Sequence, residues 1–363
     1  MKLRYIIALV LLGLAYGAFQ PGQLTYAFGH ATLYILLPAL LFEAAWNLQY
    51  RAMRRQWRAI TTLVLPGVAL TALVIAGALA LVRVPFGVAL LTGAILSATD
   101  PIAVIAVFRQ LKVPLTLRTI VECEALFNDA VAVVLYRGVL AFLVASGTGG
   151  IASIALWSVA GSLGGLGIGV AIAFVVGTLL RSRTNAGWKM FATVSCAYVS
   201  YFAAEAAHCS GIFATIACGI ALRYFERSWI TLRVAEDVNR FWDLAALAAN
   251  AIVFFLVGAA LDVSVLTRAP VFVVATLVGV AVARFAIVGL LLPAGFPRAW
   301  LDVIRVASMR GALSLALALA LPQSVPYREA IIAAVFAVAI ATILSSGLTV
   351  PRVVTRAARP DSP

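Results

Sequence analysis

Charged residues are scarce in this sequence: they make up 11% of the 363 residues, against about 25% in a typical soluble domain. Acidic residues are the scarcer kind, with 14 Asp and Glu against 27 Lys and Arg. Hydrophobic residues account for 64% of the chain, more than a soluble globule of this length can bury. The apolar runs are continuous, which excludes the alternating pattern of a membrane β-barrel. The composition therefore predicts a polytopic all-α membrane protein.

Cysteine is also rare, and the four cysteines lie in or beside apolar runs without the spacing of metal ligands. We interpret them as small residues buried in the membrane. No cofactor motif accompanies them, so we expect neither a bound cofactor nor an enzyme.

The apolar runs set the number of membrane spans, because about 20 apolar residues cross a bilayer. Twelve candidates are found, and the connections between them leave no room for a separate soluble domain. The candidates cover residues 5–19, 31–48, 59–82, 87–108, 119–145, 152–180, 190–207, 210–223, 240–260, 269–292, 300–321 and 329–350.

Basic residues test this count through their distribution over the loops. If the N-terminus is cytoplasmic, 19 of the 27 basic residues fall on the inside, 3 on the outside and 5 in or at the edge of helices. This bias follows the positive-inside rule and predicts that both termini are cytoplasmic. It also accounts for the net charge of +13 without a nucleic-acid partner. The inside residues are Lys2, Arg4, Arg51, Arg54, Arg55, Arg58, Arg109, Lys112, Arg118, Arg181, Arg183, Lys189, Arg223, Arg227, Arg233, Arg298, Arg352, Arg356 and Arg359.

Ionisable residues at membrane depth are costly and indicate function. On the fourth helix, Asp100 is followed by Pro101 within an apolar run. Proline removes one backbone hydrogen bond and clashes with the preceding turn, and the freed carbonyls need another partner in lipid. Thr99, Asp100 and these carbonyls together offer several oxygens to a hard cation, so we expect an ion site here rather than an ordinary kink.

The fifth helix carries further carboxylates in VECEALFNDAVAVV. At about 100° per residue, Glu122 and Asp129 fall near one face, whereas Glu124 and Asn128 share another. Asp129 is therefore expected to face a cavity, and Glu124 to face another helix. A lone charge buried in lipid is destabilising, whereas a pair is tolerated. We expect Glu124 to pair with Arg310 as a structural tie.

Two helices have similar polar interruptions early in an apolar run, at Ser97–Val104 (SATDPIAV) and Ser308–Leu315 (SMRGALSL). Broken helices at matching positions in two halves are typical of transporters with inverted repeats. We therefore predict breaks near Asp100 and Arg310.

Five sequence blocks in this order resemble the cation–proton antiporters, in particular the NhaP-like sodium/proton exchanger branch. The blocks are SATDPIAV, ECEALFNDAVAVVLY, YFAAEAAHCSGIFATIACGIALR, NAIVFFLVGAAL and MRGALSLALALALP. The resemblance extends from about residue 5 to 352.

The resemblance implies roles for individual residues. Asp129 resembles the carboxylate that binds the cation or proton, and Asn128 the neighbour that orients it. Thr99 and Asp100 resemble the residues of the unwound fourth helix that line the site. Glu43, in LLFEA, resembles an acidic residue that contributes to or borders the site. A Na⁺ site at Asp129, Asp100 and Glu43 is thus implied, and Glu124 and Arg310 resemble the family's interhelical ion pair.

The resemblance also implies a single transmembrane domain over residues 1–363. Its inverted repeats cover about 5–145 and 190–350, with a linker helix at 152–180 and a short cytoplasmic tail at 351–363. The family has a serine where this chain has Ala125 and a glycine where it has Cys123. It also has one more helix at the start, so the first family helix is expected to be missing or to lie upstream of Met1. A homodimer is implied, and the missing helix bears on that assembly.

The predicted function is secondary antiport of a monovalent cation, Na⁺ first and Li⁺ or K⁺ next, against H⁺ in a bacterial inner membrane. The Asn-Asp pair is associated in the family with electroneutral exchange. Two alternatives remain open: a transport-impaired truncated homologue or cation channel, and an intramembrane aspartyl protease with Asp100 and Asp129 as its dyad.

Overall fold

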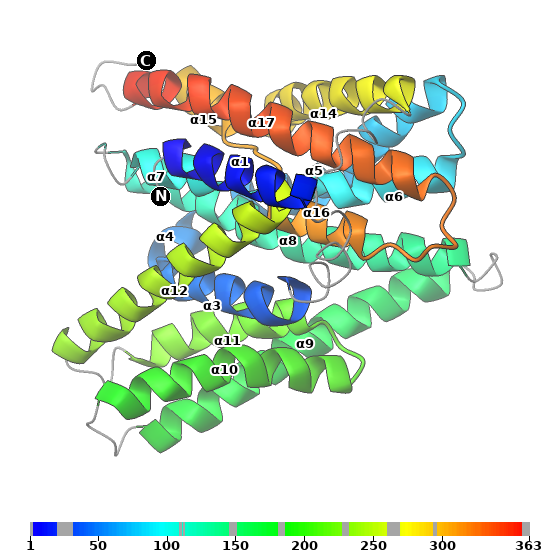
Figure 1. Ribbon diagram of the computed structural model, residues 1–363. Helices are drawn as coiled ribbons and strands as arrows, with labels where there is room; N and C mark the ends of the chain where they lie inside the picture. Colours follow the sequence, from blue (N-terminus) through cyan, green and yellow to red (C-terminus); the bar gives the residue numbers. More distant parts are fainter. Residues whose placement is uncertain are drawn as a thin grey trace. The chain divides into compact units, whose positions relative to one another are not determined.

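The protein is described here by a computed structural model, in which apolar helices make up nearly all of the chain (Figure 1). The structure describes residues 3–19, 32–108, 111, 113–144, 151–180, 186–226, 232–259, 269–292 and 296–357. Several basic loop residues of the predicted topology lie outside this part, as does the end of the predicted tail beyond Ala357. Those residues are Lys2, Arg109, Lys112, Arg181, Arg183, Arg227, Arg268 and Arg359.

Each of the twelve predicted spans coincides with one or two described helices. The helices are α1 (Leu3–Phe19), η1 (Thr32–Leu36), α3 (Leu37–Asn47), α4 (Tyr50–Arg55), α5 (Trp57–Leu81), α6 (Phe86–Ser97), α7 (Ile102–Phe108), α8 (Leu115–Val144), α9 (Ile151–Leu180), α10 (Ala186–Ala206), α11 (Gly211–Glu226), α12 (Leu232–Ala259), α14 (Pro270–Leu291), α15 (Arg298–Val306), α16 (Ala312–Leu319) and α17 (Arg328–Ala357). Helix α4, which no expected span covered, is six residues long and has no buried side chain.

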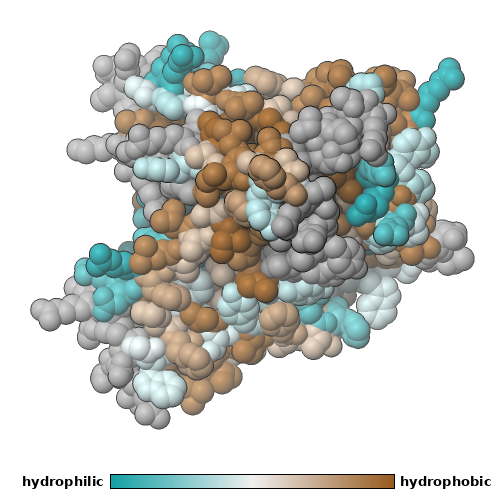
Figure 2. All heavy atoms as spheres, in the orientation of Figure 1, coloured by the Kyte–Doolittle hydropathy of each residue, from teal (hydrophilic) through white to brown (hydrophobic). Residues whose placement is uncertain are grey.

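Membrane-spanning length is reached by six of the described helices, and four shorter helices are also apolar. The six are α5, α8, α14, α17, the part of α9 from Leu156 to Leu180 and the part of α12 from Glu236 to Ala259. Predicted spans four and eleven are each divided into two short helices, α6 with α7 and α15 with α16. Figure 2 shows apolar side chains over much of the visible surface, as expected for helices that face lipid.

The chain divides into two compact units. Unit 1 comprises Met1–Thr32, Arg51–Thr148 and Phe254–Pro363, and unit 2 comprises Leu33–Tyr50 and Gly149–Val253. Unit 1 therefore draws its helices from both predicted repeats.

In unit 1, α5 packs against α6, α8 and α14, and α17 packs against α7, α14, α15 and α16. The contact between α5 and α6 is close at Gly93, where an added Cβ would overlap the backbone of Ala72. A buried apolar cluster joins the helix ends on one side of the unit, with Leu63, Phe108 and Ile120 among its members.

In unit 2, α9 and α11 form the most extensive packing, and α3 and α10 pack against them. Its core contains the aromatic pair Phe42 and Trp242, with ring centroids 4.9 Å apart. The indole of Trp46 donates to Asn239 Oδ1 at 2.8 Å, which satisfies its polar atom inside the core. All four cysteines are free thiols, and three of them are buried, whereas Cys209 is half-buried.

Candidate ion-binding site

The first helix break separates α6 from α7 at residues 98–101. Proline cannot donate a backbone hydrogen bond, and it disfavours helical geometry in the residue before it. Pro101 therefore stops α6 before Asp100, while its own carbonyl accepts from Ile105 N at 2.8 Å and begins α7. This confirms the predicted break near Asp100.

The second break separates α15 from α16 at residues 307–311 and confirms the break predicted near Arg310. Hydroxyl groups of α17 form hydrogen bonds with the backbone of this second break. Arg310 N donates to Thr342 Oγ1 at 3.0 Å, and Ser346 Oγ donates to the carbonyl of Val306 at 3.1 Å. A helix packed alongside thus provides the hydrogen bonds that the interrupted helix lost.

The two breaks lie against each other. Asp100 N donates to Met309 O at 2.9 Å in an isolated antiparallel bridge, and Ser314 Oγ donates to Ile95 O at 2.8 Å. A Cβ added to Gly311 would overlap the side chain of Asp100, so only glycine fits there. The Asp100 carboxylate consequently lies at the N-terminus of α16, where the helix dipole favours negative charge.

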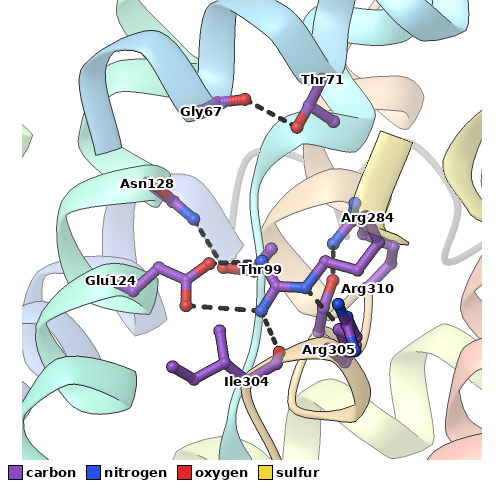
Figure 3. A network of polar contacts seen from close by, with 10 residues as sticks. Gly67, Thr71, Thr99, Glu124, Asn128, Arg284, Ile304, Arg305 and Arg310 are labelled. Carbon is purple, nitrogen blue, oxygen red and sulfur yellow. Dashed lines mark hydrogen bonds and ion pairs between the residues drawn. The ribbon is translucent and has the colours of Figure 1, made fainter. Parts of the chain in front are cut away.

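Helix α8 brings the Asn-Asp pair to this crossing. Asn128 Nδ2 donates to Thr99 Oγ1 at 3.1 Å, as Figure 3 shows. Asn128 Oδ1 is buried and has no partner among the described residues. Asp129 is half-buried, and its electrostatic neighbours are Asp100, Arg310 and the backbone of Thr99. Carboxylate, amide and hydroxyl oxygens therefore gather where both helices are unwound, and these are the ligands that hard cations prefer.

The described residues contain no group of three or more His, Cys, Asp or Glu placed to hold a metal ion. Four of the five predicted site residues, namely Thr99, Asp100, Asn128 and Asp129, lie in unit 1. Glu43 lies on α3 in unit 2, where its Oε1 accepts from Asn47 Nδ2 at 2.6 Å. Its contribution to the site stays a prediction.

Glu124 has a partner other than the predicted one. Arg284, on α14, forms a two-pronged ion pair with it, at 2.5 Å from Nη1 to Oε1 and 3.4 Å from Nη2 to Oε2. Both side chains are largely buried, with 12% and 4% exposed for Arg284 and Glu124. Arg284 also donates to the carbonyls of Ile304 and Arg305 at the end of α15 (Figure 3). The predicted Glu124–Arg310 pair is wrong, because tertiary packing places Arg284, in the middle of an apolar helix, against Glu124.

Arg310 is instead buried beside its own helix break. Its Nη1 donates to Ser308 Oγ at 2.7 Å, and its Nε has no partner in the described part of the chain. Glu124, Asp129 and Arg284 are its electrostatic neighbours, so its charge still acts on the site without a direct ion pair.

Two adjoining broken helices beside a half-buried carboxylate, in a chain rich in apolar helices, are the features of the class of secondary transporters. The profile of the family "Sodium/hydrogen exchanger, transmembrane" matches residues 1–356, so this chain belongs to that family.

Characterised relatives are similar over nearly the whole chain. The low-affinity Na⁺/H⁺ antiporter NhaS1 of Synechocystis sp. is 32% identical, over 96% of this chain and 68% of its own length. The Na⁺/H⁺ antiporter NhaG of Bacillus atrophaeus is 31% identical, over 95% and 69%. The fold is similar to that of the sodium proton antiporter MjNhaP1 from Methanocaldococcus jannaschii, with a TM-score of 0.79, 18% identity, and coverage of 97% of this chain and 92% of that one.

Proposed function

We propose that this protein exchanges a monovalent cation for H⁺ across a membrane, with Asp129 as the residue that carries either one. The observation that carries this proposal is the position of the Asn128–Asp129 pair beside two crossed helix breaks, in a chain of the sodium/hydrogen exchanger family.

Competition for one carboxylate explains the coupling of the two fluxes. A carboxylate in surroundings of low dielectric constant resists ionisation, so either a proton or a cation neutralises Asp129, but not both together. The hydroxyl of Thr99 and the amide oxygen of Asn128 supply further oxygen ligands. If only the neutralised forms cross between inward-facing and outward-facing states, one ion moves in each direction and the exchange is electroneutral.

The proposal extends to the preferred cation, the membrane location and the oligomeric state. Na⁺ is the preferred cargo, with Li⁺ and K⁺ as the alternatives, and Glu43 borders the cation path. The protein lies in the inner membrane of a bacterial cell with both termini in the cytoplasm, and it forms a homodimer.

Proteoliposomes with an acidic interior and a trapped pH dye test the exchange. We expect Na⁺, Li⁺ or K⁺ outside to alkalinise the interior, and Asp129→Asn to abolish this response while the protein remains folded. Asp302→Asn is the matched control, because Asp302 is an exposed carboxylate paired with Arg305 on α15; it should keep the full response. Cation-driven proton flux retained by Asp129→Asn would contradict the assignment.

The same experiment separates the alternatives. A channel would carry cation current without proton counter-transport, and a transport-impaired homologue would give no flux with any cation. The intramembrane protease alternative is the less supported one, because the family to which the chain belongs is named for sodium/hydrogen exchange.

A further inference from the structure

Four arginines form one stripe where α4 leads into α5. Their side chains are all exposed, and their spacing of i, i+3, i+4 and i+7 places them on one helical face. Backbone hydrogen bonding continues through the junction at Gln56, which donates to Ala52 O at 3.2 Å and accepts from Ile60 N at 3.0 Å. We call this set the arginine stripe: Arg51, Arg54, Arg55 and Arg58.

The arginine stripe continues the lipid-facing side of α5. At about 100° per residue, Thr61, Leu65 and Leu73 fall on the same helical face as the arginines. Thr61 is exposed, and Leu65 and Leu73 are 58% and 48% exposed. Trp57 is 55% exposed at the junction, a position typical of tryptophans at the membrane–water interface. We therefore expect the arginines to lie where this side of α5 leaves the hydrocarbon and enters the headgroup layer.

In the part of the chain that the structure describes, none of the four guanidinium groups has a carboxylate partner. Arg58 lies over the ring of Trp57, 5.7 Å from its centroid. Arg118 and Arg305, by contrast, are each paired with an acidic residue of their own helix. Among the residues that the structure describes, the stripe is thus a concentration of positive charge without acidic partners.

We propose that the arginine stripe binds the phosphodiester headgroups of anionic phospholipids. Guanidinium groups bind phosphate through two parallel hydrogen bonds, and the stripe spans roughly 10 Å along the helix axis, which suits adjacent headgroups. A soluble polyanion or a free phosphate would fit the charge alone. A phospholipid can bind the arginines through its headgroup and contact the apolar side of α5 and the exposed indole of Trp57 through its acyl chains. A phospholipid is therefore the occupant that this surface favours.

The test uses the purified full chain in a neutral detergent. Phosphatidylglycerol, phosphatidylcholine or inorganic phosphate is added, and the thermal unfolding midpoint is followed together with bound lipids in native mass spectrometry. We expect phosphatidylglycerol alone to raise the midpoint, by roughly 3–5 °C, and to remain bound. The variant R51Q/R54Q/R55Q/R58Q should lose at least half of that rise, and the corresponding lysine variant should keep more of it than the glutamine variant.

The matched control removes exposed arginines from other helix ends of unit 1, in R298Q/R352Q/R356Q. This variant should keep the response to phosphatidylglycerol. An equal loss in the control would mean a general charge effect and would overturn the proposal. An equal rise with inorganic phosphate, or an undiminished response in the glutamine variant, would overturn it as well. Binding is measured without transport, so the result is independent of whether the chain exchanges ions.

Discussion

The two helix breaks of unit 1 differ in what produces them. The first break contains Pro101, which interrupts a helix by its own covalent structure. The second contains no proline, and it is held by α17 hydroxyls, by the closeness of Gly311 to Asp100, and by Arg284 at the end of α15. The first break is therefore favoured by its own sequence as well as by tertiary contacts, whereas the second depends on tertiary contacts alone. Substitutions far along the chain should act mainly on the second break.

The largest expected effect comes from the ion pair that ties α8, α14 and α15. Removing one partner of a buried pair leaves an uncompensated charge and typically costs about 3–5 kcal/mol. Arg284→Met should therefore lower the stability of the folded protein by about that amount, measured as the unfolding midpoint in detergent. The second break should be weakened with it, because the Ile304 and Arg305 carbonyls lose their donor.

A double-mutant cycle distinguishes Arg284 from Arg310 as the partner of Glu124. Glu124→Gln combined with Arg284→Met should be clearly non-additive, with a coupling of about 1–3 kcal/mol. Glu124→Gln combined with Arg310→Met should be closer to additive. The reverse order of the two couplings would show that the ion pair has been assigned to the wrong arginine.

Gly311→Ala tests the closest approach between the breaks. The new methyl group would overlap both the Cβ and the carboxylate of Asp100, so the bridge from Asp100 to Met309 must shift. Overpacking of this kind costs about 1–3 kcal/mol, and cation-driven proton flux should fall because both unwound segments are displaced. Gly77→Ala on α5 is the matched control, since a Cβ there meets nothing within 4 Å. Unchanged flux in Gly311→Ala would show that the breaks tolerate separation.

Thr342→Val tests the support that α17 gives to the second break. Valine has a similar shape but cannot accept the hydrogen bond from Arg310 N, and an unsatisfied buried donor costs about 1–3 kcal/mol. We expect a loss of stability and a higher cation concentration for half-maximal flux. Thr71→Val is the control, because the Thr71 hydroxyl donates to Gly67 O of its own helix (Figure 3). If both variants behave alike, α17 does not hold the break through Thr342.

Features set by a local sequence signal could be predicted from the sequence, whereas contacts between helices could not. Apolar run lengths predicted the twelve segments that coincide with helices, of which six reach membrane-spanning length. Pro101 beside a carboxylate predicted the first break, because these signals are local. The partner of Glu124 was missed because Arg310 was taken as the only strongly placed cation at membrane depth, and only tertiary packing places Arg284 beside Glu124. Thr342, Ser346 and Ser314 were missed too, because a hydroxyl in an apolar helix normally bonds its own backbone, and nothing local indicates that it reaches a neighbouring helix.

Pro101→Ala should give the smallest effect, although proline is the more visible signal. The substitution returns a backbone donor and increases the freedom of the unfolded chain, which costs about 0.4–1 kcal/mol. The break should persist, because a continuous helix would pull Asp100 N away from Met309 O, and Ser314 away from Ile95 O. Near-normal cation-driven flux with a small drop in the unfolding midpoint is therefore expected. Abolished flux in a stable protein would contradict this expectation. It would mean that Pro101 alone keeps the first break open, and that the contacts with Met309 and Ser314 do not.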